Sequence, residues 1–163
     1  MNCLAEAAQL DALPAVDAAF PCRVAPDELL LVAPAGSHPD LLGQVAGLLE
    51  DGDPHALVLD QTPGWSVWSL AGPNVWRAFA RLSAIPVPST RPAFVQGTIA
   101  EVPGKAVVLA DRLHLLVPSP LGHHLRARVL TACADLGPRE TEPQALLLEA
   151  MPIETQTVGG SRS

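Results

Sequence analysis

The sequence predicts an α+β fold in which one strand-and-helix unit occurs twice, and three observations lead to this prediction. Strand-like and helix-like segments alternate along the 163 residues. Hydrophobic residues make up 48% of the chain, which is enough for the core of one domain of this length. Residues 27–51 also align without a gap on residues 111–135. We therefore expect a single α+β domain built from two repeats.

The N-terminal third is expected to contain two helices and one buried strand. A short amphipathic helix is expected over residues 1–13, and the apolar run 28–33 (ELLLVA) is typical of a buried strand. A second helix opens at Pro39 and ends at the breaker residues 51–54 (DGDP). Its apolar residues have the spacing of a core-facing helix: Leu41, Leu42, Val45, Leu48 and Leu49.

Two short strands and a helix are expected next. Residues 56–60 and 65–70 form the strands, separated by a turn at Pro63-Gly64. A helix follows Gly72-Pro73, because proline is favoured at a first helical position. Its buried face is expected to consist of Val75, Trp76, Phe79 and Leu82. The proline-rich segment 86–92 is expected to form a crossover loop or a linker.

The last part repeats this alternation of strands and a helix. A strand over 93–102 is expected to turn at Pro103-Gly104, since a type II turn favours proline and glycine at its central positions. Further strands are expected at 105–110, 113–117 and 145–150, with a helix over 123–136 that stops at Gly137-Pro138. The tail 152–163 is polar and is expected to fray.

The internal alignment has a constant shift of 84 residues. Seven of its 25 pairs are identical, whereas chance would give roughly two. The identical pairs are Asp27/Asp111, Leu29/Leu113, Leu31/Leu115, Pro34/Pro118, Leu41/Leu125, Val45/Val129 and Asp51/Asp135. A shared strand–proline–helix rhythm is the alternative explanation. A true repeat predicts duplicated ββαββα (ferredoxin-like) units that pair their sheets about a pseudo-twofold axis, each sheet covered by its own helices.

These elements define the expected domain organisation. An N-terminal segment, 1–20, precedes a single domain, 21–151, which consists of repeats at about 21–85 and 92–151. Residues 152–163 follow as a flexible tail. Strands that face helices on one side and a second sheet on the other are expected to be apolar on both faces, as ELLLVA is.

Charge and cysteine usage exclude several classes of protein. The chain has 10 Lys plus Arg against 17 Asp plus Glu, a net charge of −7, and no Tyr, so we expect no nucleic-acid partner. Cys3, Cys22 and Cys133 are widely spaced without a C-x-x-C, which suits a reducing compartment. No signal peptide or apolar membrane span is recognised, so the chain is expected to be cytoplasmic and not to bind a membrane.

The search for reactive motifs favours structural roles. No Gly-rich phosphate loop and no G-x-S-x-G occur, so Ser37 is expected to lie in a helix-start loop. His123 and His124 are adjacent and therefore point about 100 degrees apart on a helix, which disfavours a shared metal. We expect both to be solvent-exposed histidines in the first turn of the helix. His114 alternates with leucines and is expected to be a satisfied strand histidine.

Two further clusters also favour structural roles. Asp51, Asp53 and His55 fit turn chemistry, because the loop lacks the length and the closing Glu of a calcium site. Trp65, Trp68 and Trp76 lie close together; core packing is expected for at least two of them, and contact with a partner protein is the alternative.

Four segments carry a resemblance to a known family. Residues 67–82 (VWSLAGPNVWRAFARL) look like the strand–Gly-Pro–helix signature of the glycine-cleavage T-protein and aminomethyltransferase superfamily. Residues 23–34 (RVAPDELLLVAP), 57–65 (LVLDQTPGW) and 111–117 (DRLHLLV) resemble the gamma subunit of heterotetrameric sarcosine oxidase. The similarity keeps the same order over residues 21–136.

The resemblance implies a folate-binding-domain-like fold without the complete catalytic machinery. Catalytic members carry a Gly-Gly-x-x-x-Asp-Asp-like hairpin, but the corresponding residues 102–110 contain no acid. The Gly-Tyr-x-Gly-Glu-like motif is also absent. We therefore expect no catalytic, cofactor-binding or metal-binding residue in this chain. FAD or FMN, NAD and tetrahydrofolate are expected in partner subunits, namely the flavoprotein alpha and beta subunits of an amine oxidase.

The expected function is that of a non-catalytic subunit of a multi-subunit, flavin-dependent, sarcosine-like amine oxidase or demethylase. Such a subunit would support assembly and the cavity that leads to folate. Two alternatives remain: a stand-alone tetrahydrofolate-dependent aminomethyl or one-carbon transferase, and a homodimeric scaffold.

Overall fold

Two antiparallel sheets of four strands each form the centre of the described structure, a computed structural model that describes residues 1–16, 19–34 and 38–141. The first sheet has the strand order β2-β3-β1-β4. Its strands and helices are β1 (Asn2–Leu4), α1 (Ala7–Ala12), β2 (Phe20–Ala25), β3 (Glu28–Val32), α2 (His38–Glu50) and β4 (Leu57–Leu59).

The second sheet has the strand order β5-β8-β7-β6. Its strands and helices are β5 (Trp65–Ala71), α3 (Val75–Leu82), β6 (Ala93–Ile99), β7 (Val102–Val108), β8 (Arg112–Pro118) and α4 (Gly122–Ala132). Three short 3-10 helices join these elements: η1 (Thr62–Gly64), η2 (Ser119–Leu121) and η3 (Ala134–Leu136).

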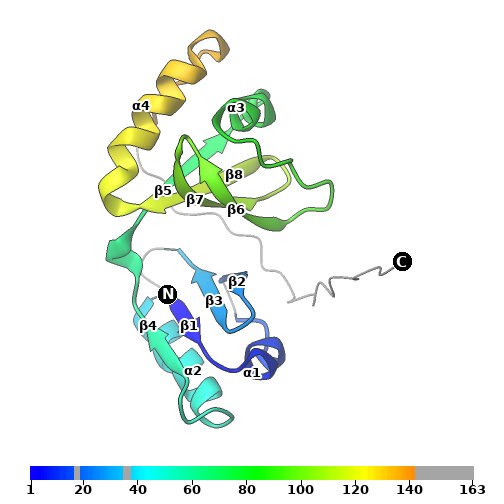
Figure 1. The fold of residues 1–163 in the computed structure, drawn as a ribbon, viewed down its shortest axis with the longest axis vertical. Helices are drawn as coiled ribbons and strands as arrows, with labels where there is room; N and C mark the ends of the chain where they lie inside the picture. Colours follow the sequence, from blue (N-terminus) through cyan, green and yellow to red (C-terminus); the bar gives the residue numbers. More distant parts are fainter. Residues whose placement is uncertain (17–18, 35–37, 142–163) are drawn as a thin grey trace.

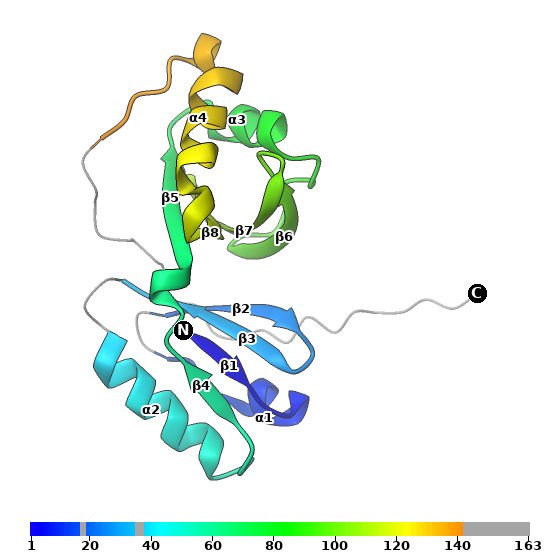
Figure 2. The same ribbon diagram turned by 60° about the vertical axis from the view of Figure 1, so that its left-hand side comes forward.

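The two sheets lie face to face, and each carries its own pair of helices on its outer face (Figures 1 and 2). Apolar residues of the first sheet pack with α1 and α2 in one core, and those of the second sheet pack with α3 and α4 in another. A third core joins the sheets and includes Phe20, Cys22, Leu30, Val107 and Leu116. The predicted α+β class, with two sheets that are each covered by helices, is confirmed.

The internal repeat coincides with equivalent elements of the two halves. The shift of 84 residues maps the first residue of β3 onto that of β8, and the first residue of α2 onto that of α4. Leu29 and its counterpart Leu113 are both buried, and each packs with the helices of its own half. The identical leucines of the alignment are buried in both halves, whereas the two identical aspartate pairs are exposed. The pseudo-twofold relation between the halves stays a prediction.

The order of elements differs from the predicted ββαββα. The first half has the order βαββαβ, and the described part of the second half has the order βαβββα. The predicted helix over 1–13 is wrong for residues 2–4, which form β1 between β3 and β4. Segment 1–20 therefore contributes to the first sheet and does not merely precede the domain. A strand of three residues is too short for its period of two to be recognised.

The predicted division of the repeats at 85–92 also differs from the structure. Strands β4 and β5 belong to different sheets, because β4 pairs with β1 whereas β5 pairs with β8. The chain passes between the sheets at η1, so the two halves meet near residues 60–64. The proline-rich segment lies within the second half, where the Arg91 guanidinium stacks 3.9 Å from the centroid of the Trp76 ring.

The hairpin turn between β6 and β7 lies earlier than predicted. Ala100 and Glu101 form the turn with φ values of 52° and 70°, whereas Pro103 and Gly104 lie inside β7, opposite Thr98 and Gly97. Tertiary contacts hold this left-handed turn: the Ala100 N–H donates to Leu82 O, and His124 Nε2 lies 2.8 Å from Ala100 O. Turn preferences of single residues could not reveal these contacts.

The remaining predicted elements are confirmed within one to four residues at most ends. The strand at 28–33, the helix from residue 39 and the strands at 56–60 and 65–70 correspond to β3, α2, β4 and β5. The predicted helix over 123–136 comprises α4 and η3. The predicted strand at 145–150 and the tail at 152–163 lie outside the described residues.

Two adjacent leucines of α2 provide a test of which face of this helix packs in the first core. Leu49 is 1% exposed and packs in the first core. The prediction that Leu48 also faces the core is wrong, because its side chain is 41% exposed. We expect Leu49→Ala to lower the free energy of unfolding by about 3 kcal/mol, because it removes buried methyl groups and leaves a cavity. The matched change Leu48→Ala should cost under about 0.5 kcal/mol. Urea unfolding measures both; equal losses would contradict the assigned face of α2.

The β6–β7 turn provides a second test. Glu101 has a positive φ and also accepts a hydrogen bond from Arg128 at 2.8 Å. Glu101→Ala removes the carboxylate but keeps the unfavourable backbone conformation. Glu101→Gly should be about 0.5–1 kcal/mol more stable than Glu101→Ala, because glycine adopts a positive φ without steric cost. A glycine variant less stable than the alanine variant in urea unfolding would show that the turn is unstrained.

Candidate functional site

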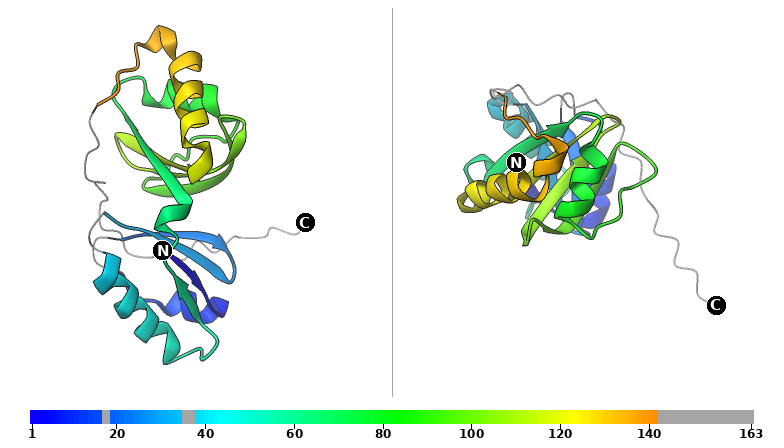
Figure 3. Two further views of the ribbon diagram at one scale, coloured as in Figure 1. Left: turned by 90° about the vertical axis from the view of Figure 1, so that its left-hand side faces the viewer. Right: turned by 90° about the horizontal axis from the view of Figure 1, so that it is seen from above.

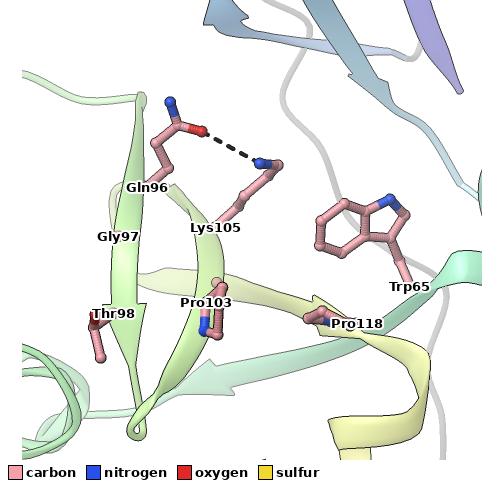
Figure 4. Close-up of a pocket in the computed structure, with 8 residues that line it drawn as sticks. Trp65, Gln96, Gly97, Thr98, Pro103, Lys105 and Pro118 are labelled. Atoms are coloured by element: carbon pink, nitrogen blue, oxygen red, sulfur yellow. Dashed lines mark hydrogen bonds between the residues drawn. The ribbon is translucent and has the colours of Figure 1, made fainter.

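A groove of about 340 Å³ opens on the second sheet, on the side that faces β2 (Figure 4). Strands β5, β6, β7 and β8 all contribute to it. Its lining consists of Trp65, Gln96, Gly97, Thr98, Pro103, Gly104, Lys105 and Pro118. The Gln96 side chain joins this groove to the first sheet, because its Nε2 donates to Val24 O of β2 at 2.8 Å.

Lys105 supplies the positive charge of the groove and is the single lysine of the sequence. Its Nζ donates to Gln96 Oε1 at 3.2 Å and lies 5.3 Å from the centroid of the Trp65 ring (Figure 4). The ammonium group is therefore attracted to the face of the indole. Within the described ranges, no carboxylate forms a salt bridge with Lys105, although acidic residues predominate in the sequence.

The floor of the groove is backbone rather than side chain. Gly97, with φ 156°, pairs with Gly104 across the β6–β7 ladder. A Cβ atom on Gly97 would lie 3.0 Å from Ile85 Cδ1, and one on Gly104 would lie 3.2 Å from Ile99 Cβ. The glycines thus permit close packing of Ile85 and Ile99 beneath the hairpin.

The groove places the flat indole of Trp65 beside the ammonium group of the half-buried Lys105. The ammonium can pair with a carboxylate, and the indole with the adjoining prolines can bury an apolar side chain. Trp is also enriched among the residues that dominate the energy of protein interfaces. The arrangement therefore suits an acidic residue flanked by an apolar one.

A second surface is apolar and lies on the inner faces of β1, β4 and β5. We call it the uncovered face; it consists of Leu4, Leu57, Leu59 and Val67, with 36%, 47%, 38% and 43% of their areas exposed. Their neighbours Cys3 and Val58 pack toward α1 and α2, so Leu4, Leu57 and Leu59 point to the opposite side of the sheet. Strands β4 and β5 follow one another along the same side of the molecule (Figure 3).

His114 is buried in the second sheet, as predicted for a satisfied strand histidine. It is 1% exposed, and its Nδ1 lies 2.7 Å from Ser69 Oγ on the neighbouring strand β5. In the internal alignment His114 occupies the position of Leu30, which lies in the core between the sheets. A polar pair therefore replaces an apolar contact at this point of the second half.

The three cysteines are free and buried. Burial raises the pKa of Cys3 from 9.0 to about 11, and burial also raises the pKa values of Cys22 and Cys133. A thiolate, not a thiol, is the nucleophile and metal ligand, so these environments suppress cysteine reactivity. The thiols pack as small apolar side chains.

The acidic loop has the predicted turn chemistry. The Asp53 carboxylate accepts hydrogen bonds from the His55 and Glu6 N–H groups, both at 2.9 Å, and these bonds lower its pKa. Among the described residues no group of three His, Cys, Asp or Glu side chains could hold a metal ion. Ser37 lies outside the described residues.

The paired histidines and the tryptophans agree only in part with expectation. His123 is exposed as predicted, but His124 is half-buried and contacts the β6–β7 turn. Trp68 and Trp76 pack against the core of the second half, which confirms the structural assignment for two of the three tryptophans. Trp65 packs partly against the core between the sheets and also lines the groove.

Sequence reasoning did not single out Gln96 or Lys105. The available signal was that the chain contains one lysine, but its position beside Trp65 depends on the register of three strands. Residues 40 positions apart, Trp65 and Lys105, meet because β8 lies between β5 and β7.

The fold belongs to the class of α+β proteins with two facing four-stranded antiparallel sheets. It is similar to a chain of the solved heterotetrameric sarcosine oxidase from Corynebacterium sp. U-96, in complex with pyrrole 2-carboxylate. The TM-score is 0.70 at 21% sequence identity, and the match covers 86% of this chain and 82% of that chain. No protein-family profile and no curated protein sequence matches. In the described part of the chain, no helix combines the length and the hydropathy needed to cross a membrane.

The raised thiol pKa values predict how stability depends on pH. Because the pKa of Cys3 rises to about 11 on folding, the unfolded chain loses this proton at lower pH than the folded chain does. Its contribution to stability is complete below pH 9 and is lost as the pH rises from 9 to 11. We expect the free energy of unfolding to fall over this interval, and Cys3→Ala to reduce the slope. Urea unfolding under reducing conditions measures it; an unchanged slope would refute the assignment.

Proposed function

We propose that this chain is a non-catalytic subunit of a multi-subunit, flavin-dependent amine oxidase or demethylase related to sarcosine oxidase. The observation that carries the proposal is the fold match, which spans most of both chains. The resemblance of residues 23–34, 57–65 and 111–117 to sarcosine oxidase gamma subunits supports it independently of the coordinates.

The chemistry of the described side chains agrees with a structural role. The thiols are buried with raised pKa values, His114 pairs with Ser69 within the sheet, and the Asp53 carboxylate caps backbone groups. The accessible groove offers recognition by Trp65 and Lys105. In this proposal FAD or FMN, NAD and tetrahydrofolate bind in cytoplasmic partner subunits, and this chain completes the wall of the cavity that leads to folate.

The Trp65–Lys105 groove is the proposed contact with a flavoprotein subunit. An ammonium group with no ion pair among the described residues gains most from a partner's carboxylate, and the indole can bury an adjoining apolar side chain. The net charge of −7 makes this groove a positive point on an acidic chain, so it also directs the partner's orientation.

Co-expression with candidate flavoprotein subunits, followed by size-exclusion chromatography, tests the assembly. We expect a stable complex that contains this chain. A chain that elutes alone in the presence of every candidate subunit would overturn the proposal. Micromolar binding of tetrahydrofolate to this chain alone would instead favour the transferase, and a partner-independent dimer in light scattering would favour the scaffold.

A pair of charge variants tests the groove. Lys105→Glu should weaken the complex at least roughly tenfold, because it places like charges together at the contact. Lys105→Arg keeps the positive charge and should retain most of the affinity. Surface plasmon resonance on the co-purified subunits measures both constants. Equal affinities for the two variants would place the contact elsewhere while leaving the subunit assignment intact.

A further inference from the structure

The four outer strands of the two sheets differ in how well their edges are protected against pairing with another strand. Strand β4 pairs with β1 through only three residues, and β2 carries Pro21, Arg23 and a bulge. Strand β6 is covered by the segment after α3, because Ser83 Oγ donates to Thr98 O at 2.7 Å. Short length, proline, charge, bulges and covering segments are the features that keep edge strands from pairing. Three of the four edges therefore carry such a protection.

Strand β5 has none of these protections in the described structure. Its seven residues (WSVWSLA) include no proline, glycine or charged residue, and its pairing with β8 runs without a shift from Trp65 to Ala71. Among the described residues, no strand pairs with its other side. Every second residue of β5 directs its backbone N–H and C=O away from β8, because these groups alternate along an antiparallel strand. The outer edge of β5 is therefore a template for one more strand.

The side chains beside this edge are apolar or small. Trp65 packs between the sheets, so Val67, Ser69 and Ala71 lie on the same inner face of β5 by alternation. All three are exposed, Val67 by 43%. A further strand would lie about 4.8 Å from β5, and its inner side chains would cover Val67. The edge thus offers apolar area in addition to backbone hydrogen bonds.

The Trp65–Lys105 groove lies at one end of the same edge. Trp65 is the first residue of β5, and Lys105 Nζ lies 5.3 Å from the centroid of its ring. A strand that adds antiparallel to β5 starts opposite Ala71 and ends beside Trp65. A carboxylate that follows this strand can pair with Lys105, which has no salt bridge to a carboxylate in the described ranges. The edge and the groove therefore form one continuous surface.

We propose that a partner chain adds an extended segment to the outer edge of β5, antiparallel to it, and that an acidic residue directly after this segment pairs with Lys105. The identity of the partner as a flavoprotein subunit rests on the proposed function. In this type of recognition the main-chain hydrogen bonds supply affinity and the side chains supply specificity. Here the residue that covers Val67 is apolar, and the charge of Lys105 selects the direction of the segment.

Hydrogen exchange with single-residue resolution, on the isolated chain and on its co-purified complex with a flavoprotein subunit, tests the added strand. We expect every second amide of β5 to exchange roughly tenfold more slowly in the complex. An unchanged rate in a complex that forms would overturn this inference and leave the subunit assignment intact, whereas the absence of any complex would overturn both. Equally slow exchange in the isolated chain would mean that the edge is already covered, and would also overturn the inference.

A pair of lysine variants tests the edge by affinity. Val67→Lys places a charge on the inner face of the edge strand and should weaken the complex at least roughly tenfold. Leu57→Lys places the same charge on β4, at a position that is 47% exposed, and should retain most of the affinity. Surface plasmon resonance measures both constants. Equal losses would mean that the partner contacts the uncovered face as a whole, and would refute strand addition at β5. The exchange experiment on the unaltered chain decides the matter if Val67→Lys does not fold.

Carbodiimide cross-linking of the complex tests the direction of the segment, because the chain contains a single lysine. We expect Lys105 Nζ to form an amide bond with a partner carboxylate that directly follows, in the partner's sequence, the segment whose amides become protected. Lys105→Arg keeps the charge, cannot form this bond and serves as the control. A cross-link to an acidic residue that precedes the protected segment, or no cross-link at Lys105, would overturn the proposal.

Discussion

The packing of one sheet directly on the other is the constraint on which the rest of this structure depends. It requires the central strands to be apolar on both faces, since helices cover one face and the opposing sheet covers the other. Leu29 and Leu31 of β3 pack toward the helices, whereas Leu30 and Val32 pack between the sheets. The same division holds on β8, where Leu113 and Leu115 face the helices and Leu116 faces the other sheet. Once these strands alternate in this way, the helices can lie only on the two outer faces.

The contact between the sheets also determines where the surface can act. It is centred on β2 and β3 of the first sheet and on β7 and β8 of the second, which leaves β4 and β5 at its margin. The apolar residues Leu57, Leu59 and Val67 lie on these two strands. The groove lies on the inner face of the second sheet, where Lys105 lies against Trp65 and is linked through Gln96 to β2. These two surfaces differ in chemistry, and the charged one is suited to selective recognition of a partner.

The three thiol groups and the His114 imidazole lie inside the fold. Burial keeps the thiols protonated, and the Ser69–His114 pair lies within the sheet ladder. The fold is shared with a chain of heterotetrameric sarcosine oxidase. The two halves share equivalent elements, β3 with β8 and α2 with α4, but they present unlike surfaces. The two halves also differ at positions that the internal alignment pairs, such as Leu30 and His114.

The sequence by itself determined the local elements with strong patterns: the apolar strands β3 and β8, the helices α2 and α4, and the repeat that relates them. These patterns are visible because burial imposes a regular spacing of apolar residues. Strand β1, the exchange of sheets at η1 and the Ala100-Glu101 turn were decided by tertiary structure. A three-residue strand has no readable period, a break between strands does not say which sheet each joins, and a positive φ at Ala100 is held by Leu82 and His124. The Trp65–Lys105 groove likewise depends on strand register, which brings together residues that no local pattern connects.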